Sequence, residues 1–321
     1  MKKYAILILL LAFILLKSKG QQTPKEPPGK FVTVNGHRIW CLAFGKGAPL
    51  LFIAGGPGSA HYFWPDMNQF SDSFQVIYFD AFGRGASDRA KDPSEYSFQH
   101  DVDEVEGLRI ALGLGKINVY GHSYGGIVAQ GYALKYPNSI SHLILANTIY
   151  SAEMWQKGNN DTWNDQIQKQ LPELAQQLDS LRQKGYLSTD SAYQAIEGKM
   201  PVGMFYYYNP ENARVSLYSS PPNAFNIEVY KRIAGPDADV IVGGDIANLD
   251  FRSRLKEIKI PTLIIAGRYD RVAIPKYAVQ FKTFMPQAKF IMFEKSGHLP
   301  YKEEPSLHAE MLRDFLNNRY H

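Results

Sequence analysis

The chain has 321 residues, of which 45% are hydrophobic and 21% are charged, and it contains one cysteine. These figures exclude a disordered protein, a small domain held together by disulfides and a polytopic membrane protein. The formal net charge of +4 comes from four lysines within the first twenty residues, and the rest of the chain balances 31 basic residues with 31 acidic ones. The basic surface that a nucleic-acid-binding protein needs is therefore not visible in the sequence.

Residues 1–20 are typical of a secretory signal peptide. Two lysines precede an apolar run over residues 4–16, and the small residues Ser18 and Gly20 follow it. This run is shorter than the roughly 20 residues that a membrane span needs. We expect cleavage near Gly20, export to the periplasm or the medium, and no stable membrane insertion afterwards; an uncleaved anchor is the alternative. Residues 21–30 are rich in proline and polar residues and are expected to form a linker.

Short apolar runs alternate with helical patterns along the first half of the chain. The runs expected to form strands are 31–34, 37–42, 49–53, 75–79, 117–120 and 141–145. A tight turn at Asn35-Gly36 is expected to join the first two, because both residue types tolerate positive φ angles. Short buried strands that alternate with helices indicate an α/β protein, with a mostly parallel sheet flanked by helices on both faces.

The composition changes between residues 149 and 255, which are rich in Gln, Asn, Tyr and Trp and contain no comparable strand-like run. Strand-like runs return at 258–266 and 289–293, before a helical pattern over 305–318. The sequence therefore predicts an α/β core over residues 31–148 and 256–321, interrupted by a mostly helical cap over residues 149–255. Cys41 lies in a strand-like stretch and is expected to be a small buried hydrophobic residue.

The clearest chemical motif is Gly121-His122-Ser123-Tyr124-Gly125. It follows a predicted strand and precedes a helical pattern over residues 126–135. A serine on such a sharp turn projects beyond the end of the sheet, and glycines beside it avoid clashes. The N-terminus of the following helix also favours developing negative charge. We expect Ser123 to be a nucleophile, and a glycine-rich turn without chemistry is the alternative.

A serine nucleophile needs a base, and the base needs an acid that orients it. Asp270 and His298 each lie just after a predicted strand, and their order after Ser123 is the one that this architecture uses. We therefore expect Ser123, Asp270 and His298 to form a catalytic triad. His61 and His100 remain candidates for a pocket.

The loop Gly55-Gly56-Pro57-Gly58 follows another predicted strand. Backbone amides can approach a substrate closely at glycines, so the amides of Gly56 and Tyr124 are the expected donors of an oxyanion hole. A plain turn is the alternative. The sequence has no dinucleotide-binding or phosphate-binding loop and no cluster with metal-ligand spacing, so we expect no cofactor and no metal.

Together these motifs resemble the α/β-hydrolase fold. The similar segments are Gly55–Gly58, Tyr78–Ser87, Gly121–Gly126, Gly267–Asp270 and Ser296–His298. Within this fold the chain is most similar to the proline iminopeptidase branch of serine aminopeptidases, including the tricorn-interacting aminopeptidases, over most of residues 31–318. The resemblance implies a triad of Ser123, Asp270 and His298, an oxyanion hole of Gly56 and Tyr124, and a cap over the site.

The chain departs from that branch in two places. Ala54 stands where the branch usually has a histidine, and Arg271 stands where related aminopeptidases have an acidic residue that holds the substrate α-ammonium. The resemblance leaves Asp237 and Asp239 as candidates for that role in the cap. Phe205 begins an aromatic run that could line an apolar pocket, although packing within the cap is the alternative.

Three functions fit these residues. The first is a serine aminopeptidase that releases N-terminal residues, often proline, from small peptides. The second is an esterase, lactonase or amidase that acts on small molecules. The third is a binding protein without turnover, which a complete triad disfavours. The expected partner is a small peptide or small acyl substrate rather than a nucleic acid.

Overall fold

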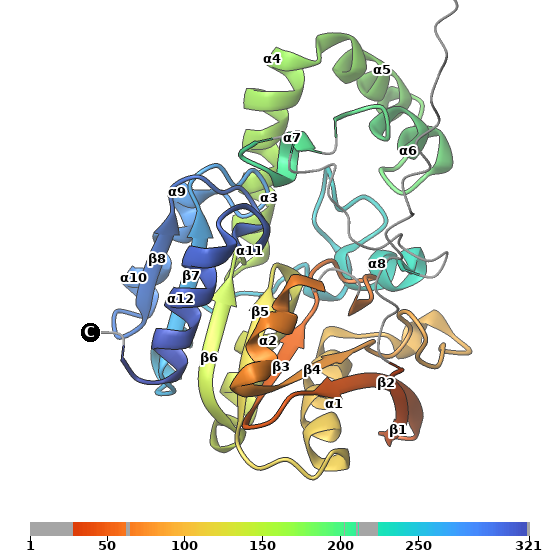
Figure 1. Ribbon diagram of the computed structural model, residues 1–321. Coiled ribbons are helices and arrows are strands. Elements are labelled where there is room, and N and C mark those ends of the chain that lie inside the picture. Colours follow the sequence, from red (N-terminus) through yellow and green to blue (C-terminus); the bar gives the residue numbers. More distant parts are fainter. Residues whose placement is uncertain (1–27, 62–64, 202, 210, 212–223, 320–321) are drawn as a thin grey trace, which may run out of the picture.

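A computed structural model describes residues 28–61, 65–201, 203–209, 211 and 224–319 (Figure 1). Within these residues one eight-stranded sheet has the order β1-β2-β4-β3-β5-β6-β7-β8. Its strands are β1 (Lys30–Val34), β2 (His37–Phe44), β3 (Ala48–Ile53), β4 (Phe74–Phe79), β5 (Ile117–His122), β6 (Ile140–Ala146), β7 (Thr262–Gly267) and β8 (Lys289–Phe293). The strands β3 to β8 are parallel, and β1 and β2 pair antiparallel at one edge. The predicted α/β fold is confirmed.

The hairpin at this edge turns where the sequence predicts. Asn35 and Gly36 have φ angles of 49° and 87°, which suit the tight turn between paired Val34 and His37. Cys41 in β2 is fully buried, and burial raises the pKa of its thiol. The prediction that it is a small core residue is confirmed.

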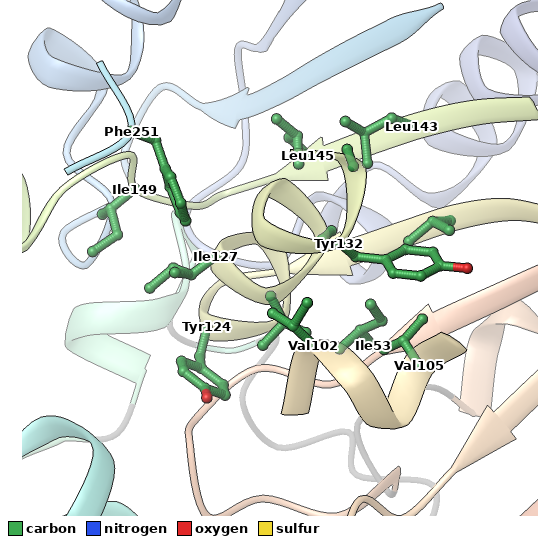
Figure 2. Close-up of a cluster of buried hydrophobic side chains, with 14 of the residues drawn as sticks. Ile53, Val102, Val105, Tyr124, Ile127, Tyr132, Leu143, Leu145, Ile149 and Phe251 are labelled. Carbon is green, nitrogen blue, oxygen red and sulfur yellow. The ribbon is translucent and has the colours of Figure 1, made fainter. Parts of the chain in front are cut away.

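Alternate residues of the central strands enter two different cores. In β3, Leu51 and Ile53 join one core, whereas Leu50 and Phe52 join the other. The first core packs against α1 (Phe98–Ala111), α2 (Tyr124–Lys135), α9 (Pro275–Ala278) and α10 (Phe281–Phe284), and Figure 2 shows part of it beside α1 and α2. The second packs against η2 (Pro65–Asp72), α11 (Pro300–Glu303) and α12 (Pro305–Leu316). Helices therefore cover both faces of the sheet, as predicted.

Between β6 and β7 the described residues are mostly helical. The elements are α3 (Ala152–Thr162), a π-helical turn η5 (Trp163–Ile167), α4 (Gln168–Gln170), α5 (Pro172–Gln183), α6 (Ser191–Glu197), α7 (Gly203–Tyr206), α8 (Ile227–Ala234), η7 (Gly244–Ile246) and η8 (Leu255–Glu257). Helices α4 to α7 lie together beyond the ends of the strands (Figure 1). The turn η5 and helices α5 to α7 share a small core of their own around Leu178, Tyr193 and Met200.

No helix within the described residues is long and apolar enough to cross a membrane. The predicted signal peptide and most of the linker, residues 1–27, lie outside the described part of the chain.

Candidate active site

Ser123 occupies a strained turn between β5 and α2. Its φ angle is 53°, which non-glycine residues seldom adopt. The turn is held by the Ser123 N–H, which donates to the Ala146 carbonyl at 3.0 Å, and by the Thr148 hydroxyl, which donates to the Ser123 carbonyl at 2.6 Å. A Cβ on Gly125 would lie 2.1 Å from the Ile53 carbonyl oxygen, so only glycine fits there. The turn has the geometry of a nucleophile elbow.

Asp270 and His298 form a buried pair at the same edge of the sheet. His298 Nδ1 lies 2.9 Å from Asp270 Oδ2, and each residue is only 2% exposed. The other carboxylate oxygen accepts the backbone N–H groups of Val272 and Ala273. Burial by itself would raise the pKa of Asp270, but His298 and these hydrogen bonds outweigh it and lower the pKa. Asp270 is therefore an anion that can orient the imidazole.

Contacts around His122 bring the elbow to the loop that carries His298. The two imidazole rings are 4.7 Å apart, and His122 Nε2 donates to the His298 carbonyl at 2.8 Å. Burial lowers the pKa of His122 to about 3, so its ring is neutral. A Cβ on Gly55 would lie 2.9 Å from both Ser123 Cβ and His122 Nδ1. The elbow, the glycine loop after β3 and the histidine loop therefore meet at one place.

The two expected oxyanion donors lie on segments that a buried ion pair holds together. Arg84 donates to both oxygens of Asp101, at 2.7 and 2.6 Å, and to the Pro57 carbonyl at 2.7 Å. The Tyr124 hydroxyl donates to Asp101 at 2.6 Å. Tyr124 begins α2, where backbone N–H groups have no partner within the helix. Gly56 has a φ angle of 63°, which glycine adopts freely. A cavity beside them is lined by Ile53, Ala54, Gly56, Pro57, Ser59, Phe79, Ala81, Arg84, Asp101, Tyr124 and Val128.

Two cap carboxylates, Asp239 and Glu197, form an acidic pair whose charges interact. The Tyr230 hydroxyl donates to Asp239 Oδ1 at 3.0 Å. Asp239 is solvent-exposed, and desolvation by the protein around it raises its pKa. Burial and the charge of Asp239 together raise the pKa of Glu197 to about 7.

Tyr206 links this acidic pair with His298. Its ring meets the His298 ring edge-on at a centroid distance of 5.7 Å, and its backbone carbonyl accepts the His298 N–H at 2.8 Å. Desolvation by the surrounding protein and the charges of Asp239, Glu197 and Asp270 raise the pKa of Tyr206 to about 12, although 40% of the residue is exposed. Tyr206 therefore contacts His298 directly, and the charges of the cap carboxylates act on its phenol.

Some candidate residues are engaged elsewhere. Asp237 accepts hydrogen bonds from Arg182, at 2.5 and 2.7 Å, and so joins α5 to the segment after α8 within the cap. Phe205 packs against the cap core, as the packing alternative predicts. Arg271, where an acidic residue stands in related aminopeptidases, donates to the carbonyl of Met204.

The two other candidate histidines, His61 and His100, pack against aromatic side chains. His61 pairs with buried Asp80 at 2.7 Å and stacks on Trp40 at 4.1 Å. His100 stacks on Phe82 at a centroid distance of 5.1 Å.

The sequence predictions missed His122 as a positioning residue, and they missed Glu197 and Asn147 altogether. Asn147 donates to Asp270 Oδ2 at 2.9 Å and follows β6 directly. A search for polar residues at the carboxyl ends of all predicted strands would have found it. Glu197 has no comparable signal, because only the packing of the cap brings it near Asp239.

A sequence profile of the alpha/beta hydrolase fold matches residues 48–305. The chain belongs to the α/β-hydrolase family. The proline iminopeptidase of Heyndrickxia coagulans is 30% identical to this α/β-hydrolase over 292 residues, which are 90% of this chain and 98% of the relative. Family membership and this relative identify the chain as an enzyme of the serine-hydrolase type.

Two solved structures share the fold. The crystal structure of a proline iminopeptidase from Mycobacterium smegmatis has a TM-score of 0.74 at 24% identity and covers 91% of this α/β-hydrolase and 98% of its own chain. An enol-lactonase from Burkholderia xenovorans has a TM-score of 0.59 at 21% identity and covers 89% and 99%. At these identities the likeness shows the architecture alone.

Proposed function

We propose that this α/β-hydrolase is an aminopeptidase of the proline iminopeptidase type, which releases the N-terminal residue of small peptides. Ser123 Oγ attacks the scissile carbonyl while His298 accepts its proton, and Asp270 holds the imidazole in the required tautomer. The amides of Gly56 and Tyr124 stabilise the oxyanion. His298 then gives its proton to the leaving amine, and water hydrolyses the acyl-enzyme by the reverse steps.

The observation that carries this proposal is the acidic pair of Asp239 and Glu197, together with Tyr206, whose ring contacts His298. An aminopeptidase must bind a charged α-ammonium close to the scissile carbonyl, and an unpaired buried cation is costly. Asp239 and Glu197 supply carboxylates on the cap side, and Tyr206 connects them with His298. Within the described residues no lysine or arginine contributes to the pKa of either carboxylate, and a substrate ammonium would supply such a cation. The named proline iminopeptidase relatives support the same activity.

An esterase or lactonase activity is the second candidate. The same triad and oxyanion donors serve ester hydrolysis, and Arg271 brings a cation where related aminopeptidases have an acid. The likeness of the fold to the enol-lactonase is consistent with this alternative.

Three substrates separate the candidates: prolyl-β-naphthylamide, its N-acetylated form and p-nitrophenyl acetate. We expect the free amine to be cleaved and the blocked one to be cleaved far more slowly. The variant Asp239→Asn should raise KM for the free amine and leave the ester unaffected, because the ester has no ammonium. Cleavage of the blocked substrate at the rate of the free one would remove the aminopeptidase and leave the second candidate.

We further propose that residues 1–20 direct export and are removed near Gly20, leaving a mature chain without a membrane anchor. The proposal is supported by the order of lysines, apolar run and small residues. N-terminal sequencing of the protein from its native source tests it. A mature chain that begins near residue 21 supports export, and an intact Met1 on soluble cytoplasmic protein contradicts it.

A further inference from the structure

The carboxylate of Glu303 joins two segments that are far apart in the sequence. It accepts the backbone N–H of Gly297 at 2.6 Å, beside His298, and those of Tyr208 and Asn209 at 3.0 and 3.1 Å, in the cap. Glu303 itself ends α11 of the core. One side chain thus binds a catalytic loop and a cap segment at once.

A fourth hydrogen bond runs directly between the same two segments. The His298 N–H donates to the Tyr206 carbonyl at 2.8 Å. A Cβ on Gly297 would lie 2.7 Å from that carbonyl oxygen, so the segments approach this closely only because residue 297 is a glycine. Hydrogen bonds to a carboxylate are stronger than neutral ones, and amides that lose such an acceptor are left unpaired.

We infer that Glu303 is a positioning residue that makes residues 206–209 of the cap and the His298 loop move as one unit. The inference rests on the proposed roles of His298 and of the acidic pair Asp239 and Glu197. Tyr206 begins this cap segment. Its ring packs against His298, and the charges of Glu197 and Asp239 act on its phenol. Glu303 therefore fixes the distance between the carboxylates proposed to bind the substrate ammonium and His298, the proposed general base.

The neighbouring Glu304 provides a matched control. Its carboxylate accepts the Lys295 N–H at 2.9 Å and the Ser296 hydroxyl at 2.6 Å, both within the histidine loop. The backbone of Glu304 is bonded within the core: its N–H donates to the Pro300 carbonyl at 2.8 Å, and its carbonyl accepts the His308 N–H at 2.9 Å. Replacing Glu304 removes bonds within the histidine loop and leaves the cap segment bound. Replacing Glu303 removes bonds to the histidine loop and to the cap segment.

Residue-resolved amide hydrogen exchange tests the coupling without any substrate. The informative amide is that of His298, because it bonds to Tyr206 and not to Glu303. In Glu303→Ala we expect this amide to exchange about tenfold faster, since unpaired amides destabilise the joined arrangement. In Glu304→Gln we expect faster exchange at Lys295 with His298 unchanged.

Kinetics in the same variants give the second measurement. Glu303→Ala should lower kcat for both prolyl-β-naphthylamide and p-nitrophenyl acetate, and raise KM for the amine only. Glu303→Gln keeps one acceptor oxygen and should recover part of each loss, which also serves if the alanine variant folds poorly. Wild-type protection of the His298 amide in both Glu303 variants, or equal effects of Glu303 and Glu304 replacement, would overturn the inference. Because the exchange measurement needs no substrate, it stands even if the aminopeptidase assignment fails.

Discussion

The side-chain amide of Asn147 donates to Oδ2 of Asp270 at 2.9 Å, and this same oxygen lies 2.9 Å from His298 Nδ1. Asn147 is 1% exposed and has a φ angle of 47°, which asparagine tolerates better than most residues. It also donates to the Gly297 carbonyl at 3.2 Å. One residue at the end of β6 thus orients both the acid and the loop of the proposed base.

Removing this donor should reduce turnover without weakening substrate binding. Asn147→Asp keeps the shape but sets a second carboxylate against Asp270, and Asn147→Gly keeps the backbone conformation but removes the side chain. We expect kcat to fall about tenfold or more in both variants, because the buried Asp270 carboxylate loses the hydrogen bond from Asn147. KM should stay near the wild-type value. Asn35→Gly, an exposed turn residue with a φ angle of 49°, is the matched control. Full activity in Asn147→Asp would remove the positioning role.

The fold could be predicted because its signals are local. Apolar runs of strand length, glycines at the elbow and the Asn35-Gly36 turn each lie within a few residues, and the structure confirms the strands and the turn that they predict. The order of Ser123, Asp270 and His298 follows from the positions of the strand ends. Parallel strands bring those ends to one edge of the sheet.

The supporting residues could not be predicted because their roles depend on distant contacts. Asn147 acts on Asp270 across 123 positions, and His122 acts on His298 across 176. The choice between Asp237 and Asp239 depends on Arg182, which the sequence does not place beside either one. Such contacts exist only after the cap and the loops have packed.

Ser123 should be the covalent nucleophile. Because triad members act as a unit, Ser123→Ala should lower kcat by about a million-fold. The alanine can occupy the same φ angle with the same strain, so stability should change little. The measurements are single-turnover kinetics and labelling by a fluorophosphonate probe, followed by peptide mapping. Labelling at another serine, or more than a few per cent residual activity, would exclude Ser123 as the nucleophile.

Binding of a free amine should improve as the pH rises through neutrality. The pKa of Glu197 is raised to about 7, so below that pH the carboxyl is largely protonated and attracts an ammonium weakly. We expect KM for prolyl-β-naphthylamide to fall between about pH 6 and about pH 8, while KM for p-nitrophenyl acetate stays flat. Glu197→Gln should abolish this dependence and leave KM high throughout. An ester that showed the same dependence would assign the titration to another group.

Glu104 should make the folded protein less stable as the pH rises. It is 1% exposed, and burial together with the charge of Asp101 raises its pKa to about 8, although the Phe82 N–H and Arg84 act in the opposite direction. The unfolded chain releases this proton near pH 4.3, about the usual glutamate pKa. The folded state therefore binds the extra proton, and its stabilisation is complete below about pH 4.3 and is lost as the pH rises through about 8.

Glu104→Gln remains neutral and should flatten this decline in the free energy of unfolding. The measurement is urea unfolding at several values between about pH 5 and about pH 8, over which the wild type should lose stability faster than the variant. Glu106→Gln, on the same helix, is the control. Hydrogen bonding from Arg109 lowers the pKa of Glu106, so its contribution is present above the unfolded pKa and is lost only at more acidic pH. This control should keep the wild-type slope in the tested window. A parallel slope in Glu104→Gln would show that Glu104 is ionised in the folded protein and that Arg84 neutralises it.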